Sequence, residues 1–137
     1  MEFGEVANLP QSLTDWFAAK GWAPRRHQLE MLAAARAGQD ALLVAPTGSG
    51  KTLAGFLPTL VELIEAPQDG LHSLYVSPLK ALAVDVQRNL ITPIEEMALP
   101  IRVETRTGDT PSDRKARQRV KPPQILLTTP EIGRAHV

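Results

Sequence analysis

Apolar residues fall in short runs along the chain, and four of these runs have the length of a β-strand. The predicted strands cover 41–44, 74–76, 101–105 and 124–128. The run at 41–44 reads Ala-Leu-Leu-Val, with no polar residue. An unbroken run of this kind is typical of a strand buried on both faces of a parallel sheet.

The stretches between these runs carry apolar residues at helical spacing. Leu13, Trp16 and Phe17 stand at i, i+3 and i+4 and predict a helix over 10–20, with Pro10 at its first position. Glycines that follow this helix and the next are expected to end them. The other predicted helices cover 25–37, 81–90, a stretch with Leu53, Phe56, Leu57, Leu60 and Ile64 on its inner face, and a stretch opened by Thr110 as N-cap and Pro111 at the first helical position.

Strands that alternate with helices predict βαβ units and therefore an α/β fold with a parallel sheet flanked by helices. In such sheets, ligands bind outside the carboxyl ends of the strands. The 137 residues suit one domain. We expect the sheet of so short a chain to be partial, with exposed apolar surface and an unpaired strand edge.

Composition removes several classes of function. The chain has no cysteine, which excludes disulfides, thiolate zinc sites and a cysteine nucleophile. Lysine plus arginine equals aspartate plus glutamate at 15 each, so the surface is not basic throughout. A local excess remains over 102–121, with seven basic and three acidic residues, and it suits a nucleic-acid contact and a solvated helix face equally well. No stretch has the length and apolarity of a membrane span or a signal peptide, so we expect a soluble, cytoplasmic protein with no membrane partner.

A glycine-rich segment, Ala-Pro-Thr-Gly-Ser-Gly-Lys-Thr at 45–52, joins the first predicted strand to a helix. It satisfies the phosphate-loop pattern G-x-x-x-x-G-K-[ST] except at its first position, which is Ala45. Glycines let successive N–H groups point at phosphate oxygens, and the helix N-terminus favours the same anion. The pattern predicts an ATP site with Mg²⁺, made by Thr47, Gly48, Ser49, Gly50, Lys51 and Thr52, in which Lys51 and Thr52 are the catalytic residues and Thr52 is the metal ligand.

Polar turns follow the other three predicted strands. Ser77 and Lys80 follow the second, Gly108 and Asp109 the third, and Thr128 and Thr129 the fourth. Hydroxyls, backbone N–H groups and a lysine at one sheet edge can hold sugar-phosphate oxygens without reading bases. Three classes of function stay open on this evidence: an ATP-driven motor on nucleic acid, another P-loop NTPase, transferase or kinase, and a nucleic-acid-binding module without enzymatic activity.

The same segments resemble the motifs of superfamily 2 helicases: APTGSGKT is similar to motif I, and SPLKALA, TGD and TTPE to motifs Ia, Ib and Ic. Gln28, in WAPRRHQ, resembles the Q-motif glutamine that reads adenine, although the preceding aromatic is one residue too near. An exposed polar residue on a helix is the other interpretation of Gln28. For Trp16, Phe17 and Trp22, core packing is favoured over base stacking.

Taken together, these strings resemble the large helicase-related (Lhr) family, and within it the ligase-associated DEXH-box branch, over about 9–131. The resemblance implies a RecA-like fold and an ATP-dependent helicase that moves 3′ to 5′ on single-stranded DNA in DNA repair. It also implies a DNA ligase and a nuclease as partners in the same repair set. An RNA helicase is the alternative within the superfamily.

The chain contains no D-E-x-H sequence, which in this family supplies carboxylates for Mg²⁺ and the attacking water. We therefore expect residues 1–131 to be the N-terminal part of the first motor domain, inactive by itself. Residues 132–137 depart from the family and match the translation of a common sequencing adapter, so we expect a non-native tail there. The coding nucleotides test this interpretation.

Overall fold

The computed structural model describes residues 9–44 and 51–130. The chain divides into two compact units, Met1–Pro67 and Gln68–Val137, and each is described by itself. Within the described residues, no helix is long and apolar enough to span a membrane.

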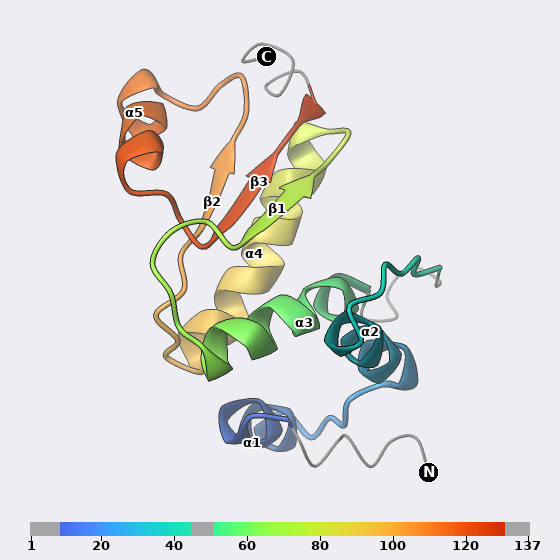
Figure 1. The fold of residues 1–137 in the computed structure, drawn as a ribbon. Helices are drawn as coiled ribbons and strands as arrows, with labels where there is room; N and C mark the ends of the chain where they lie inside the picture. The colour runs from blue at the N-terminus through green and yellow to red at the C-terminus, as the bar shows by residue number, and fades with distance from the viewer. Residues whose placement is uncertain (1–8, 45–50, 131–137) are drawn as a thin grey trace. The chain divides into compact units, whose positions relative to one another are not determined.

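The first unit is helical: α1 (Gln11–Ala19), α2 (Arg26–Arg36) and α3 (Lys51–Glu65) (Figure 1). α2 packs along α3, and Arg36 joins Glu65 at 3.4 Å where both helices end. α1 and α2 agree with the predicted ranges 10–20 and 25–37 to within one residue at each end, and α3 forms where a helix with that apolar face is predicted. The predicted inner face of α3 is buried at Phe56, Leu57 and Leu60.

Glycines end the first two helices as predicted. Gly21 and Gly38 follow α1 and α2 with φ of +72° and +71°, a conformation that costs a residue with a Cβ about 1–2 kcal/mol. Pro10 is the N-cap of α1 and not its first helical residue.

The strand predicted at 41–44 is wrong for this structure. These residues have no regular secondary structure, and Leu42 and Val44 are 88% and 85% exposed. A strand buried on both faces needs hydrogen-bonded neighbours, and the strands among the described residues all lie in the second unit, where they pair with one another. An apolar run records a preference for burial but not whether partner strands are present.

The second unit is a parallel sheet of three strands with two helices: β1 (Ser73–Val76), α4 (Lys80–Glu96), β2 (Val103–Arg106), α5 (Ser112–Val120) and β3 (Ile125–Thr128). The strand order is β1-β3-β2, so the last strand lies in the middle. In register, Ser73 and Val103 lie opposite Ile125, and Val76 and Arg106 lie opposite Thr128. The predicted α/β class with a parallel sheet is confirmed.

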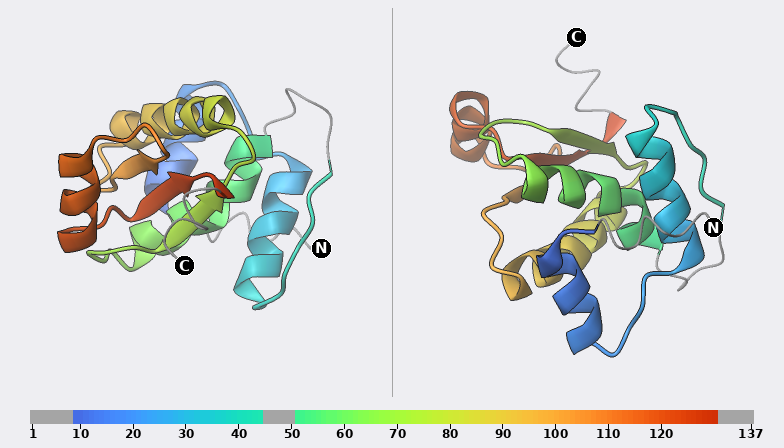
Figure 2. Two further views of the ribbon diagram at one scale, coloured as in Figure 1. Left: turned by 90° about the horizontal axis from the view of Figure 1, so that it is seen from above. Right: turned by 60° about the horizontal axis from the view of Figure 1, so that its bottom comes forward.

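α4 covers one face of this sheet. It contacts β2 and β3 and buries Ala83, Leu90 and Ile94, while Ile125 and Leu127 of the central strand are fully buried (Figure 2). α4 runs to Glu96, six residues beyond the predicted end at 90. On β1, an edge strand of the described sheet, Leu74 and Val76 are more than half exposed, which confirms the expected apolar surface.

α5 lies beside β2 and is held there by polar contacts. Gln118 is buried, and its Nε2 donates to Glu104 Oε1 at 3.0 Å and to the Thr105 carbonyl at 3.1 Å. The N-cap of α5 is Pro111 and its first helical residue is Ser112, so the predictions of Thr110 as N-cap and of Pro111 as first helical residue are both wrong by one position. The Thr110 hydroxyl instead accepts the Thr107 N–H at 2.9 Å, because the chain turns tightly before the helix begins.

Candidate functional site

The predicted phosphate-binding residues lie partly outside the described residues. Thr47, Gly48, Ser49 and Gly50 fall in the undescribed segment 45–50. Lys51 is the first residue of α3, and Thr52, the second, is half-buried. The first turn of α3 contains no acidic residue. A helix therefore begins where the sequence predicts one, and no carboxylate in that turn opposes an anion at its positive end.

Gln28 is buried, with 3% of its surface exposed, so the interpretation as an exposed helix residue is wrong. Its Oε1 accepts the Arg25 N–H at 2.8 Å, which satisfies a backbone donor at the start of α2. The side chain thus has a structural role whether or not it reads adenine.

The aromatic residues of the first unit separate by burial. Trp16 and Phe17 are buried and meet edge to face at 5.3 Å, as expected for core packing. Trp22 lies edge to face with Trp16 at 5.6 Å but is 56% exposed, so the expectation of core packing is wrong for Trp22. The Lys20 amino group lies within 6.0 Å of both indole rings.

The carboxyl ends of β1, β2 and β3 lie at one edge of the sheet because the strands are parallel (Figure 1). The six predicted nucleic-acid residues lie at or just after these ends, with Thr128 as the last residue of β3, so the fold gathers three segments that are far apart in the sequence. Hydrogen bonds join the loops: the Ser77 N–H donates to the Thr128 carbonyl at 2.8 Å, and the Thr128 hydroxyl donates to the Arg106 carbonyl at 2.6 Å.

Burial divides these six residues into two groups. Ser77, Thr128 and Thr129 are buried, and the Ser77 hydroxyl donates to the Leu79 carbonyl at 2.8 Å. Thr129 Oγ1 is buried with no hydrogen-bond partner in the described part of the chain. The exposed members are Lys80, Gly108 and Asp109. A nucleic-acid strand that approaches this edge would therefore meet the exposed residues Lys80, Gly108 and Asp109 first.

Lys80 and Asp109 form an ion pair across the edge. Lys80 is the first residue of α4, and Asp109 lies in the loop between β2 and α5. The hydrogen bond and charge of Lys80 lower the pKa of the Asp109 carboxyl, and the charge of Lys115 adds to this. The pair connects the loops of the predicted motifs Ia and Ib.

The basic residues over 102–121 also divide into two groups, those with partners inside the unit and those exposed to solvent. The guanidinium of Arg102 binds Glu104 at 3.1 Å and the carbonyls of Lys121 and Pro122, and that of Arg106 donates to the Lys115 carbonyl at 3.1 Å. These two arginines hold the unit together. The exposed basic residues that remain are Arg114, Arg117, Arg119 and Lys121.

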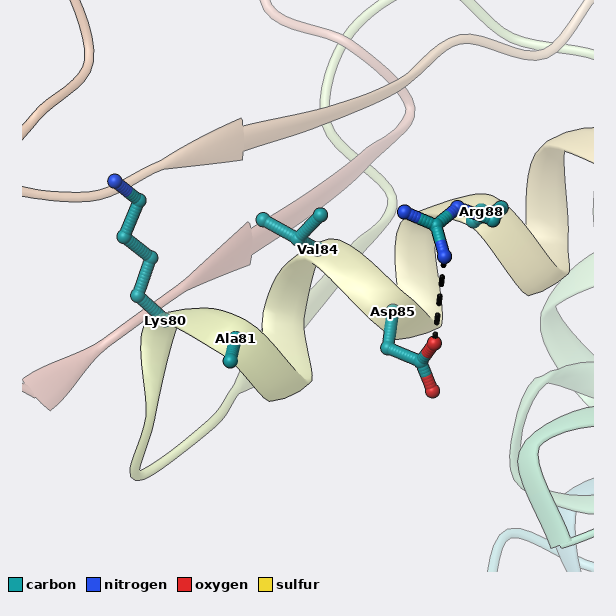
Figure 3. A pocket seen from close by; sticks show the side chains of 5 residues that line it. All are labelled: Lys80, Ala81, Val84, Asp85 and Arg88. Carbon is teal, nitrogen blue, oxygen red and sulfur yellow. Dashed lines mark ion pairs between the residues drawn. The ribbon is translucent and has the colours of Figure 1, made fainter.

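A shallow hollow along α4 extends from Lys80 and was not predicted from the sequence. Ala81, Val84, Asp85 and Arg88 also line it, and Asp85 pairs with Arg88 at 3.9 Å (Figure 3). Lys80, Val84 and Arg88 repeat every four residues, so a helical plot of 80–90 could have found this face. Among the described residues, no group of three or more His, Asp or Glu side chains could hold a metal ion.

A sequence profile described as DEAD/DEAH box helicase matches residues 25–137. The chain belongs to the DEAD/DEAH box helicase family. The three βα loops described above are thus loops of a helicase-family chain, and the RecA-like fold of solved relatives is the fold predicted from the sequence.

The relatives of this helicase-family chain include Lhr proteins. The Lhr helicase of Mycolicibacterium smegmatis is 45% identical over 130 residues, which cover 85% of this chain and 9% of that protein. The ATP-dependent helicase Lhr-Core of Methanocaldococcus jannaschii is 39% identical over 141 residues, covering 90% and 16%. The solved structure of Mycobacterium smegmatis helicase Lhr bound to ssDNA and AMP-PNP has a TM-score of 0.77 and 43% identity over 90% of this chain and 17% of that one. The chain thus spans less than a fifth of each of these relatives.

Proposed function

We propose that this chain is the nucleotide- and DNA-binding start of an Lhr-type motor, a helicase that couples ATP hydrolysis to movement on single-stranded DNA. The observation that carries the proposal is the sheet edge at which the loops after β1 and β2 present Lys80, Gly108 and Asp109 together, with the end of β3 between them. The family assignment supports ATP use, and the solved Lhr structure at 43% identity contains ssDNA and AMP-PNP.

In the nucleotide half of the proposal, α3 and the loop before it hold the phosphates. Lys51 reaches the β- and γ-phosphates, and the N-terminus of α3 adds N–H donors. The Thr52 hydroxyl is a hard oxygen ligand of the kind Mg²⁺ accepts, and its place in the first turn suits that role. The metal would neutralise charge on the phosphate oxygens. Gln28 contacts adenine in this proposal, while its Oε1 caps the start of α2.

In the DNA half, Lys80 binds a phosphate as a point charge, and the Gly108 backbone lets the strand come close. Three residues of the edge are buried and support the exposed ones: Ser77, Thr128 and Thr129. They contact the DNA strand only through backbone groups or after a local rearrangement. Contacts of this kind hold a strand without reading its sequence.

Movement 3′ to 5′, a role in DNA repair and a DNA ligase and nuclease as partners complete the proposal. Their support is the resemblance of 9–131 to the ligase-associated branch. We place the parent protein in the cytoplasm on the same basis.

The nucleotide half is tested in the longer parent protein with Lys51→Ala. We expect DNA-stimulated ATP turnover to disappear, because the charge that contacts the phosphates is lost. The fold should be retained, because the change removes only a charge at a helix N-terminus. Circular dichroism provides the control for folding. Unchanged turnover would remove the phosphate-loop assignment.

The DNA half is tested with Lys80→Ala against Lys121→Ala, which removes the same charge before β3, at the opposite edge of the sheet. Only Lys80→Ala should weaken oligonucleotide binding, about equally for different sequences, and it should reduce the slope of log K against log salt by about 0.7, one single-strand phosphate contact. A loss that depended on base sequence would contradict a phosphate contact.

A further inference from the structure

Asp109 is an unexpected residue at an edge that is proposed to bind phosphate. An ionised carboxylate has only acceptor atoms, so it cannot donate a hydrogen bond to a phosphate oxygen, and at close range the two charges repel. Lys80 is the cation among the three exposed residues at the edge, and Asp109 forms an ion pair with it. The role of Asp109 must therefore be explained through Lys80.

The place of the pair is also informative. Lys80 is the first residue of α4, whose N-terminus carries partial positive charge, and the first turn of α4 contains no acidic residue. The position thus attracts an anion from outside the helix. The Asp109 carboxylate supplies one from a loop 29 residues away, with Lys115 as a second nearby cation.

Both partners are solvated, with 54% of the Lys80 side chain and 74% of the Asp109 side chain exposed. An exposed pair of this kind is weak and can exchange partners readily. A phosphate that arrives at the edge meets Lys80 with its charge already balanced, and it must take the place of the carboxylate.

We propose that Asp109 is an internal competitor for DNA: its carboxylate occupies the phosphate position on Lys80 and exchanges with the strand. This inference rests on the proposed function. Lys80 pairs with a phosphate while DNA is bound and with the Asp109 carboxylate after the DNA leaves. Its charge is therefore balanced in both states. Asp109 therefore weakens binding at this edge and speeds release, which suits a motor that must let go of each phosphate.

The test is a double-mutant cycle in the full chain with Asp109→Asn, Lys80→Ala and the double variant, with fluorescently labelled oligo(dT) as the probe. Asp113→Asn is the matched control, since it removes the same charge from an exposed carboxylate four residues further along, which forms no ion pair within the described part of the chain. Anisotropy gives Kd and stopped flow gives the release rate. The thermal midpoint of each variant checks folding.

We expect Asp109→Asn to tighten binding about two- to five-fold, the range of an exposed ion pair, and to slow release by a similar factor. Asp113→Asn should change Kd much less, and the gain from Asp109→Asn should disappear when Lys80 is alanine. Weaker binding by Asp109→Asn would show that Asp109 positions Lys80 and would overturn the inference. A gain equal to that of Asp113→Asn, or one that persists without Lys80, would overturn it as well.

Failure of the proposed function gives a different result. If oligo(dT) binding is absent or does not change with Lys80→Ala, the DNA-binding edge itself is wrong, and the inference is overturned with it. If Lys80→Ala weakens binding and Asp109→Asn does not strengthen it, the DNA-binding edge stands and only the competition is overturned.

Discussion

Gly108 lies exposed in the loop between β2 and α5, and a Cβ added there would meet no atom within 4 Å. Gly108→Ala should therefore leave the free energy of unfolding nearly unchanged. If a phosphate must approach this backbone, the added methyl group removes one charge-assisted hydrogen bond and weakens oligonucleotide binding on the order of ten-fold. Urea unfolding and anisotropy measure the two effects.

The control for Gly108→Ala is Gly70→Ala, in the same unit. Gly70 has φ of +92°, so alanine is strained there and should lower the free energy of unfolding by about 1–2 kcal/mol. Its oligonucleotide affinity should stay unchanged once unfolding is accounted for. Equal binding losses in the two variants would contradict a specific role for Gly108.

The pH dependence of the Lys80–Asp109 pair follows from the lowered pKa of Asp109. Because the folded-state pKa is lowered, the pair contributes fully above the carboxyl's unfolded-state pKa and is lost as the pH falls through the folded-state value. An NMR titration of the Asp109 carboxyl should show the lowered pKa in the native protein and a higher one in Lys80→Ala. Added salt should also reduce the shift, because both groups are exposed.

The sequence identified the exposed residues of the edge but not the contacts among them. Lys80, Gly108 and Asp109 were found because each follows a predicted strand, and the structure leaves all three accessible. The pairing of Lys80 with Asp109 and of Thr128 with Arg106 joins residues 29 and 22 positions apart. Such contacts depend on strand order and register, which short-range patterns do not contain.

At the scale of elements, the start of α2 is capped by a proposed ligand-binding residue, Gln28. Gln28→Ala removes the acceptor for the Arg25 N–H and should lower the free energy of unfolding by about 1 kcal/mol. Gln28→Glu keeps an acceptor at the same position and should retain more of this stability. Both variants lack the amide hydrogens, so both should lose the preference for ATP over GTP in nucleotide-binding measurements. A preference retained in Gln28→Glu would contradict adenine recognition by this side chain.

α5 depends on one buried side chain for its place beside β2. Gln118 Nε2 binds Glu104 and the Thr105 carbonyl, and its Oε1 accepts from Arg106 at 3.4 Å. Gln118→Leu leaves these groups without their partner and should lower the free energy of unfolding by about 1–3 kcal/mol in urea. Arg117→Leu, at the exposed neighbouring position, is the control and should have little effect. A small effect of Gln118→Leu would show that the apolar contacts of the unit suffice to hold α5.

Helices could be predicted because their formation is decided locally, whereas of the four predicted strands only the three that pair with one another formed. α1 and α2 begin and end close to the predicted positions because prolines, glycines and apolar spacing act within a few residues. The predicted strand at 41–44 failed because strand formation depends on partners. β3, in contrast, is central in the sheet although its sequence resembles that of 41–44, since it has β1 and β2 on either side.

At the scale of the whole molecule, each unit exposes large apolar residues among its described residues. Leu42 and Val44 are exposed in the first unit, and Leu74 and Val76 in the second. The chain also spans only 9–16% of the Lhr relatives described above. ATP hydrolysis by these 137 residues is therefore measured on the chain itself.

The last prediction is that the chain by itself binds ATP weakly and does not hydrolyse it. Lys51 and Thr52 provide for ground-state binding of phosphate and Mg²⁺. Rate acceleration requires groups directed at the attacking water and at charge that develops in the transition state. The sequence contains no D-E-x-H carboxylates, and a cationic finger of the kind that supplies about 10³–10⁵ in rate in other P-loop enzymes is not identified in it.

The measurement compares the purified chain with its Lys51→Ala variant, with and without single-stranded DNA. Nucleotide binding should decrease in the variant, because a phosphate contact is lost, while phosphate release should stay at the uncatalysed level in both proteins. The Lys121→Ala variant, altered far from α3 in the sequence, controls for a general effect of charge. Turnover that is stimulated by DNA and depends on Lys51 would show that these residues suffice for catalysis and that the carboxylates of the D-E-x-H sequence are not required.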